Sequence, residues 1–213
     1  MNKKSKSMSR KLAEYASFLQ YKDLSQEVVH EVKRRLIDSF GCVLGAFESQ
    51  PAKVARGIGQ KSQISQGATL FGTSVQTTPD LAAFANGILV RYLDFNDTYL
   101  SKEPAHPSDN ISAALAVAEA EKADGKALIT SIALAYEIQC RLCDAASLRA
   151  RGWDHVSYVS IASALLASKL INLDQERIEN ALALSITPNT TLRQTRVGEL
   201  SMWKGCAAAN AAR

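Results

Sequence analysis

Apolar residues recur three to four positions apart along most of this chain, a spacing that predicts amphipathic helices and leaves little sequence for strands. The clearest case begins at Ser25, a residue type that caps helices. Its apolar positions share one helical face: Val28, Val32, Leu36, Phe40 and Val43. Hydrophobic residues make up 46% of the 213 residues and aromatic residues only 7%, which favours helix over strand. The sequence therefore predicts an all-α, multi-helix fold.

Caps, prolines and glycines predict where the other helices begin and end. Thr78 and Pro79 predict a helix start, and Ser108 is expected to cap a helix that ends near Gly125. The remaining predicted helices begin at Pro51 or cover residues 128–148, 155–171, 174–186 and 201–213. Residues 68–72 are the only strand-like piece, and we expect them to be too short to seed a sheet.

The first eleven residues hold five basic side chains and no acidic one, within a net charge of +4 for the chain. No apolar stretch follows them directly, so they do not form a secretory signal peptide. We expect residues 1–11 to be a disordered basic tail and residues 12–213 to form one helical domain. A nucleic-acid-binding arm is disfavoured, because no aromatic or glycine-rich RNA-binding pattern accompanies the charges.

No apolar run approaches the length that spans a bilayer. The four cysteines lie in apolar, helix-like segments, which indicates free thiols in a reducing compartment and predicts a cytoplasmic protein. Cys140 and Cys143 fit a C-x-x-C spacing, but they fall mid-helix without a second ligand pair. Walker A, GxGxxG and HExxH motifs are also absent, so the sequence predicts neither a metal nor a nucleotide cofactor.

The least routine segment, residues 91–110, joins the end of one apolar helix to the cap of the next. Asp94 and Asp97 are three residues apart, so at a helix end they would project from one face. His106 precedes a proline that restrains its backbone. Loops between rigid helices often carry catalytic groups, but these residue types also form ordinary caps and turns, and both interpretations stay open.

The chain has three histidines, and only two lie in unusual segments. His30 belongs to the charged side of an amphipathic helix, where we expect it to be solvated. His155 follows Asp154 in the run Gly-Trp-Asp-His. This run is consistent with a helix start capped by Asp154, and equally with a functional histidine.

Two arginines and a lysine flank a glycine turn that leads into the last predicted helix. Arg193, Arg196 and Lys204 would suit carboxylate binding, since arginine offers a bidentate fork and a helix start favours anions. A basic surface loop is the alternative. The closing run from Ala207 to Arg213 carries no glycine, proline or cap, so we expect the sequence to be a fragment of a longer protein or one part of a split gene.

Four segments together, RYLDFNDTY, HPSDN, GWDH and RVGELSMWKG, resemble the MmgE/PrpD family over essentially the whole chain after the basic tail. The resemblance implies a two-domain enzyme with a helical domain and a smaller lid domain, which is missing from this chain. It further implies a homodimer without an iron–sulphur cluster or another cofactor. The family includes 2-methylcitrate dehydratases, cis-aconitate decarboxylases and an iminodisuccinate epimerase.

The same resemblance carries site residues over by position. Asp94 matches the family's first active-site aspartate, and Thr98 lies at its substrate-contacting threonine. His106 matches the histidine of the HPS segment, His155 a second pocket histidine, and Lys204 a lysine that contacts a substrate carboxylate.

Dehydration of a hydroxy-tricarboxylate needs a base, an acid and cations for the carboxylates. We expect His106 and Asp94 to transfer protons, with His155 as a second acid or base or an orienting group. Lys204, with Arg193 or Arg196, would bind the substrate.

The activity implied is cofactor-independent dehydration of a tricarboxylic acid such as 2-methylcitrate or citrate. The insert at residues 99–104 favours this branch over cis-aconitate decarboxylation. The alternative outside the enzymes is that the chain is a truncated, non-catalytic helical module that dimerises. Without its lid the domain should expose apolar surface.

Overall fold

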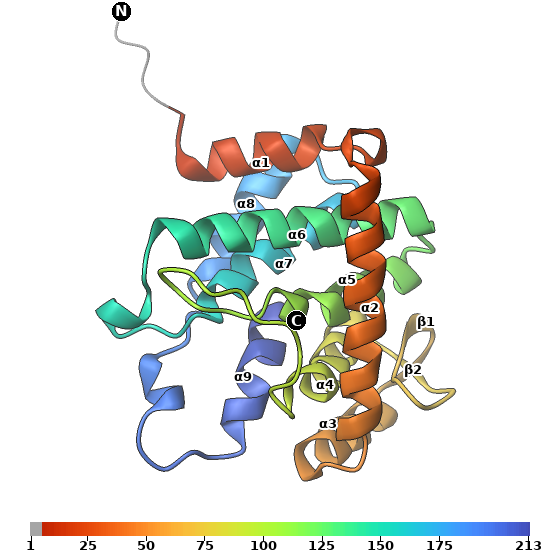
Figure 1. The fold of residues 1–213 in the computed structure, drawn as a ribbon. Helices are drawn as coiled ribbons and strands as arrows, with labels where there is room; N and C mark the ends of the chain where they lie inside the picture. The colour runs from red at the N-terminus through yellow and green to blue at the C-terminus, as the bar shows by residue number, and fades with distance from the viewer. Residues whose placement is uncertain (1–5) are drawn as a thin grey trace, which may run out of the picture.

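The computed structural model describes residues 6–213, which are built almost entirely from helices, as the all-α prediction requires (Figure 1). The α-helices are α1 (Met8–Phe18), α2 (Gln26–Ala46), α3 (Gln50–Lys61), α4 (Pro79–Arg91), α5 (Ile111–Ala120), α6 (Gly125–Ala145), α7 (Ser157–Leu170), α8 (Gln175–Ile186) and α9 (Trp203–Ala212). Short 3-10 turns are η1 (Tyr21–Asp23), η2 (Pro107–Asn110), η3 (Arg149–Arg151) and η4 (Arg193–Arg196), and the strands are β1 (Gln63–Thr69) and β2 (Gln76–Thr77).

Several predicted helix starts are confirmed, and side-chain capping accounts for two of them. The Ser25 hydroxyl accepts a hydrogen bond from the backbone N–H of Val28, and the Asp174 carboxylate accepts one from Arg177. Pro79 opens α4 as expected, in the first turn, where its missing N–H costs nothing.

Two predicted helix boundaries are wrong. Ser108 does not cap α5, because it lies inside η2, where its hydroxyl accepts a hydrogen bond from Asn96. Gly125 does not end α5 but begins α6, since Asp124 caps α6 through the backbone N–H of Ala127. A tight turn between the two helices passes through Lys122 in the left-handed backbone region.

The predicted disordered tail at residues 1–11 is wrong for residues 8–11, which form the first turn of α1. The Ser7 hydroxyl caps this helix through the backbone N–H of Arg10. Ala13 and Ala16 bury its inner face against Leu165 and neighbouring apolar residues, which explains why the segment is helical. Residues 1–5 lie outside the described residues.

A small sheet forms where we expected none. β1 pairs with β2 antiparallel, with Ala68 opposite Thr77 and Thr69 opposite Gln76. The strand also begins at residue 63, five positions before the predicted strand. Helices hold this hairpin: Glu119 of α5 accepts from the Thr69 backbone, and Asn86 of α4 donates to the Thr69 carbonyl. Anchoring by α4 and α5 stabilises a pairing that would be marginal alone.

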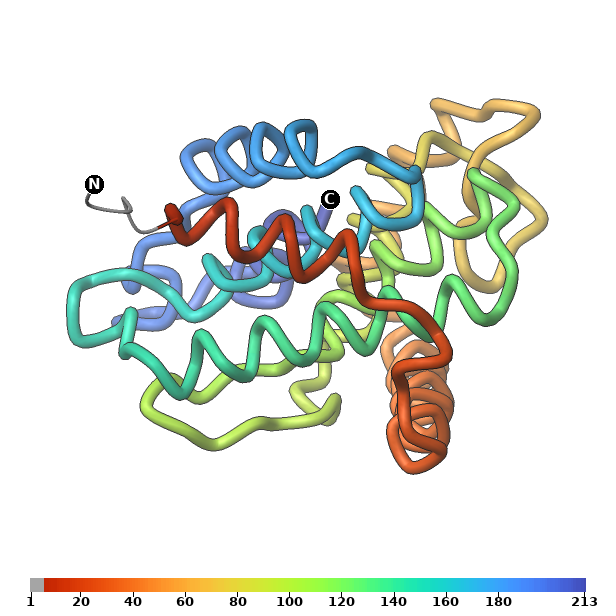
Figure 2. The backbone as a smooth tube through the Cα atoms, turned by 90° about the horizontal axis from the view of Figure 1, so that it is seen from above, coloured from red at the N-terminus to blue at the C-terminus, as the bar shows by residue number. Residues whose placement is uncertain are grey.

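The helices pack in layers, and α2 runs across α6 at one end of the molecule, as the two views show (Figures 1 and 2). α7 packs between α6 and α8, whereas α4 packs against α5 and α9. Small residues let α4 and α9 approach closely, with Gly87 facing Ala209. None of the described helices combines the length and the apolar character needed to cross a membrane.

Large apolar side chains are also exposed on two of the helices. Ile37 and Leu44 on α2 and Leu184 on α8 are each more than 70% exposed. The two cysteines of the C-x-x-C spacing lie inside α6, and Cys42, Cys140, Cys143 and Cys206 are all free thiols. His30 is exposed on α2, as predicted.

Candidate active site

A cleft of about 310 Å³ opens between the end of α4, the loop after it, the start of α7 and the first turn of α9. Its lining residues are Arg91, Asp94, Glu103, Pro104, His106, Arg149, His155, Arg193, Arg196 and Lys204. The structure therefore brings six of the seven predicted site residues together from distant parts of the sequence. Thr98, the seventh, does not line the cleft, but its hydroxyl lies 3.5 Å from Nδ1 of His106.

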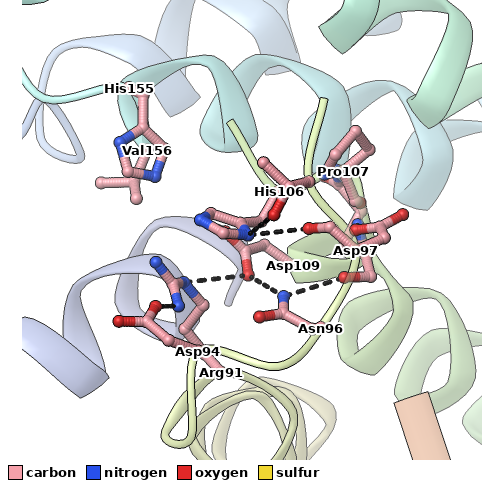
Figure 3. A network of polar contacts seen from close by, with 12 residues as sticks. Arg91, Asp94, Asn96, Asp97, His106, Pro107, Asp109, His155 and Val156 are labelled. Atoms are coloured by element: carbon pink, nitrogen blue, oxygen red, sulfur yellow. Dashed lines mark hydrogen bonds and ion pairs between the residues drawn. The ribbon is translucent and has the colours of Figure 1, made fainter. Parts of the chain in front are cut away.

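Asp94 lies where the chain leaves α4, with its backbone in the left-handed region at φ 59°. Its two carboxylate oxygens form ion pairs with Arg91 and Lys204, which joins α4 to α9 across the cleft. Asp97 does not share a face with Asp94, contrary to our expectation, because α4 ends at Arg91, before both residues, and the backbone turns at Asp94 (Figure 3). The Asp97 carboxylate instead accepts hydrogen bonds from the Tyr136 hydroxyl and the Ser108 backbone.

Behind Asp94 lies a buried ion pair. Nε of Arg91 is 3.6 Å from Oδ1 of Asp109, and Asn96 donates to the same oxygen at 3.1 Å (Figure 3). Burial lowers the pKa of Arg91 and raises the pKa of Asp109, while each partner's charge opposes the change in the other. The pair thus holds Arg91 in place beneath the cleft.

His106 has one ring nitrogen fixed by the backbone. Its Nδ1 is 2.7 Å from the carbonyl oxygen of Asp97. Because a carbonyl can only accept, Nδ1 must carry a proton and donate it. The other ring nitrogen, Nε2, is then the one available for chemistry. The ring centroid lies 5.8 Å from that of His155, so the two imidazoles face a common space.

His155 is oriented by the residue before it. Its Nδ1 lies 3.1 Å from Oδ1 of Asp154, a fully buried carboxylate that also accepts from the Val156 backbone. Asp154 is not the N-cap of α7, contrary to the helix-start interpretation, because the cap residue is Val156 and α7 begins at Ser157. Nε2 of His155 is buried and has no hydrogen-bond partner among residues 6–213.

Burial lowers the pKa of His155 far below its ordinary value, and the charges of Arg196, Arg91 and His106 act in the same direction. The carboxylate of Asp154 opposes this change without reversing it. Burial therefore favours the neutral form of the His155 imidazole.

The basic residues before α9 are partly buried and structurally connected. Nε of Arg196 donates to Oδ2 of Asp154 at 2.8 Å, and its Nη1 donates to the carbonyl of Lys204 at 3.1 Å. Burial lowers the pKa of Lys204, helped by the charges of Arg91 and Arg196. Arg193 is fixed through its backbone, which donates to the Gly152 carbonyl at 2.9 Å. A solvated basic loop does not describe this segment.

A model of the MmgE/PrpD N-terminal domain matches residues 10–213, nearly the whole chain. This chain belongs to the MmgE/PrpD family. It is 33% identical over 199 residues to the 2-methylcitrate dehydratase of Escherichia coli, which covers 88% of this chain and 41% of the relative.

Two further relatives agree with this membership. The 2-methylcitrate dehydratase of Cupriavidus necator is 35% identical over 173 residues, covering 76% of this chain and 36% of the relative. The alkylcitrate dehydratase phiI of a fungal species is 32% identical over 223 residues, covering 95% and 44%. The chain spans about two-fifths of the length of these curated relatives.

The MmgE/PrpD cleft also contains three charged residues that sequence reasoning missed: Arg91, Glu103 and Arg149. Glu103 is 1% exposed and accepts hydrogen bonds from the Ser147 hydroxyl and the Arg149 backbone, with the Arg149 side chain 3.3 Å away. Arg91 begins the RYLDFNDTY segment three residues before Asp94, so the i,i+3 spacing was a usable signal. No comparable local signal links Glu103 to Arg149, which are 46 residues apart.

Proposed function

We propose that this chain provides part of the active site of a cofactor-independent dehydratase acting on a hydroxy-tricarboxylate of the 2-methylcitrate type. The proposal rests on one observation: a histidine with an unpaired ring nitrogen and several cationic side chains line the same cleft. Nε2 of His155 offers a buried, unshared electron pair, and five cationic side chains surround it. A carboxylic acid with a removable proton beside its carboxylate complements both features.

The cations would bind the carboxylates of the substrate. Lys204, Arg193 and Arg149 line the cleft, and Nη2 of Arg196 is a buried donor without a partner in the described chain. Arginine forms bidentate hydrogen bonds with carboxylates, and low solvent access strengthens them. Asp94 and Glu103 balance part of this charge.

The contacts support different roles for the site residues from those that the residue types suggested. Asp94 already has both oxygens paired with cations, so we assign it to positioning Lys204 rather than to proton transfer. Neutral His155 would take the proton from the carbon next to a carboxylate through Nε2. His106, protonated on Nε2, would donate to the departing hydroxyl group.

The step balances. The electrons of the broken C–H bond form the carbon–carbon double bond, and the C–O bond breaks with its electron pair on oxygen. That oxygen leaves as water with the proton from His106. Exchange with solvent then returns a proton to His106 and removes one from His155.

Binding and turnover test the proposal separately. Titration of the purified chain with 2-methylcitrate and citrate should give a saturable signal. Lys204→Ala should weaken it by about tenfold or more, the effect of losing a charged hydrogen bond. Lys53→Ala, an exposed lysine on α3 outside the cleft, should leave binding unchanged.

Turnover is followed by the ultraviolet absorbance of the new conjugated double bond. Absence of tricarboxylate binding, or a Lys204→Ala chain that binds normally, would contradict the proposal. Carbon dioxide release from cis-aconitate, without dehydration of either citrate, would assign a decarboxylase instead.

We also propose that the protein is a cytoplasmic homodimer. Free thiols at all four cysteines support a reducing compartment, and the apolar side chains of Ile37 and Leu44 on α2 offer a surface to bury. Sedimentation analysis should give a dimer. A monodisperse monomer at high concentration would exclude it.

A further inference from the structure

Both oxygens of the Asp154 carboxylate are fully used. Oδ1 lies 3.1 Å from Nδ1 of His155 and accepts a hydrogen bond from the Val156 backbone, and Oδ2 accepts one from Nε of Arg196. Asp154 has no exposed surface and the Arg196 side chain is 9% exposed. Three segments therefore meet at one buried carboxylate: the start of α7, the η4 turn and, through Arg196, the first turn of α9.

We propose that Asp154 and Arg196 are positioning residues that fix His155 as the tautomer with its proton on Nδ1. The unpaired Nε2 of His155 is then held ready to accept a proton. Arg196, whose Nη2 is assigned above to substrate binding, also acts through Asp154 by its Nε. The catalytic meaning of this assignment rests on the proposed function, whereas the tautomer itself does not.

Hydrogen-bond chemistry explains the choice of tautomer. An ionised carboxylate has no proton to give, so the ring nitrogen that lies 3.1 Å from Oδ1 is the one that carries the proton of the neutral imidazole. Arg196 keeps Asp154 ionised and turned toward His155, because its Nε is 2.8 Å from Oδ2. With Arg196 absent, Oδ2 would be buried without a partner and the carboxylate would be free to rotate.

The same contacts set the distance between His155 and Lys204. Nη1 of Arg196 donates to the Lys204 carbonyl, so the η4 turn is tied to α9. The backbone of Asp154 donates to the Thr191 carbonyl at 2.7 Å, which ties the start of α7 to the segment before η4. The base and the substrate-binding lysine of the proposed mechanism are thus held by segments that are hydrogen-bonded to each other.

The charged and titratable groups around His155 come from four places. Asp154 precedes it, Arg196 lies on η4, Arg91 on α4, and His106 in the loop before η2. Two of these groups are permanent cations. They disfavour a second proton on the imidazole, which leaves the neutral form whose tautomer Asp154 selects.

Nitrogen-15 NMR of the histidine side chains measures the tautomer directly in the chain without ligand. We expect the His155 resonances to show a protonated Nδ1 and an unprotonated Nε2 at neutral pH. In Asp154→Asn the single amide oxygen should bond to Arg196, which turns the NH₂ group toward Nδ1. His155 should then change to the tautomer protonated on Nε2, while the His106 tautomer stays unchanged.

Asp144→Asn is the matched control, because Asp144 bonds to Tyr99 and Ser101 away from Asp154 and should leave His155 unaltered. A wild-type His155 protonated on Nε2, or an Asp154→Asn chain that keeps the wild-type tautomer, overturns the proposal. If Asp154→Asn does not fold, the wild-type spectrum still decides. Where turnover is detected, Asp154→Asn should lower kcat by about a hundredfold or more with little change in KM. An absence of turnover with the expected tautomer contradicts the proposed function alone.

Discussion

Gly87 lies in α4 where this helix packs against α9, and replacing it tests how closely the two helices must approach. A Cβ at this position would lie 2.9 Å from Cβ of Ala209 and 2.9 Å from Oγ of Ser112, closer than real Cβ contacts. The Cα of Ala209, at 3.1 Å, adds backbone to the obstruction, so no flexible side chain can move aside. We expect Gly87→Ala to push α9 outward and lower the free energy of unfolding by about 1–3 kcal/mol.

Gly57→Ala in α3 is the matched control, because nothing lies within 4 Å of the Cβ it would add. The same substitution there should raise the free energy of unfolding by about 0.5–1 kcal/mol, since alanine costs less backbone entropy in a helix. With a urea dependence of about 2 kcal/mol per molar, the unfolding midpoints of the two variants should differ by about 1 M. A Gly87→Ala protein as stable as Gly57→Ala would refute the close-packing argument.

Three further predictions concern the core and the buried titratable groups. Leu165→Ala removes a fully buried side chain and should lower the free energy of unfolding in urea by about 2–5 kcal/mol, whereas Leu184→Ala, at a 75% exposed position, should change it by less than about 0.5 kcal/mol. Burial raises the pKa of the Cys140 and Cys143 thiols to about 12, so iodoacetamide at mildly alkaline pH should alkylate both far more slowly in the native protein than in urea. Cys143 is fully buried, so rapid labelling of Cys143 in the native protein would contradict this prediction. The pKa of His155 is lower in the folded than in the unfolded chain, so below about pH 6.5 the imidazole takes up a proton in the unfolded chain but not in the folded one. The free energy of unfolding should therefore fall by at most about 2 kcal/mol between about pH 6.5 and pH 5. Thermal unfolding of His155→Gln should show a flatter pH dependence than that of the wild type.

The fold was predictable from sequence at several positions where a local rule decides it. Ser25 and Asp174 cap helices with their own side chains, and Pro79 begins a helix because its geometry suits a first turn. Prediction failed where a distant segment decided. The β1–β2 hairpin depends on Glu119 and Asn86, residues whose positions no local pattern reveals.

The site, too, was predictable only in part from the sequence. The residue types and their order identified the histidines, the lysine and Asp94, but not how they are paired. Asp94 was expected to transfer protons, and its contacts with two cations appear only once α4 and α9 are packed together. Glu103 and Arg149 were missed for the same reason, since only the fold brings the η3 turn beside the loop that precedes η2.

The pairing of cations with carboxylates explains how five cationic side chains can line one cleft. Arg91, Arg149 and Lys204 would repel one another across a space of about 310 Å³, and Asp94 and Glu103 supply the counter-charges that allow them to converge. In the proposed function these carboxylates would cost affinity, because the tricarboxylate would share the cations with them. In return, the donors would already be placed before the substrate arrives, so little of the binding free energy would be spent on moving them. The proposed binding site therefore includes Asp94, whose charge has the same sign as that of the substrate, because Asp94 holds Arg91 and Lys204 in place.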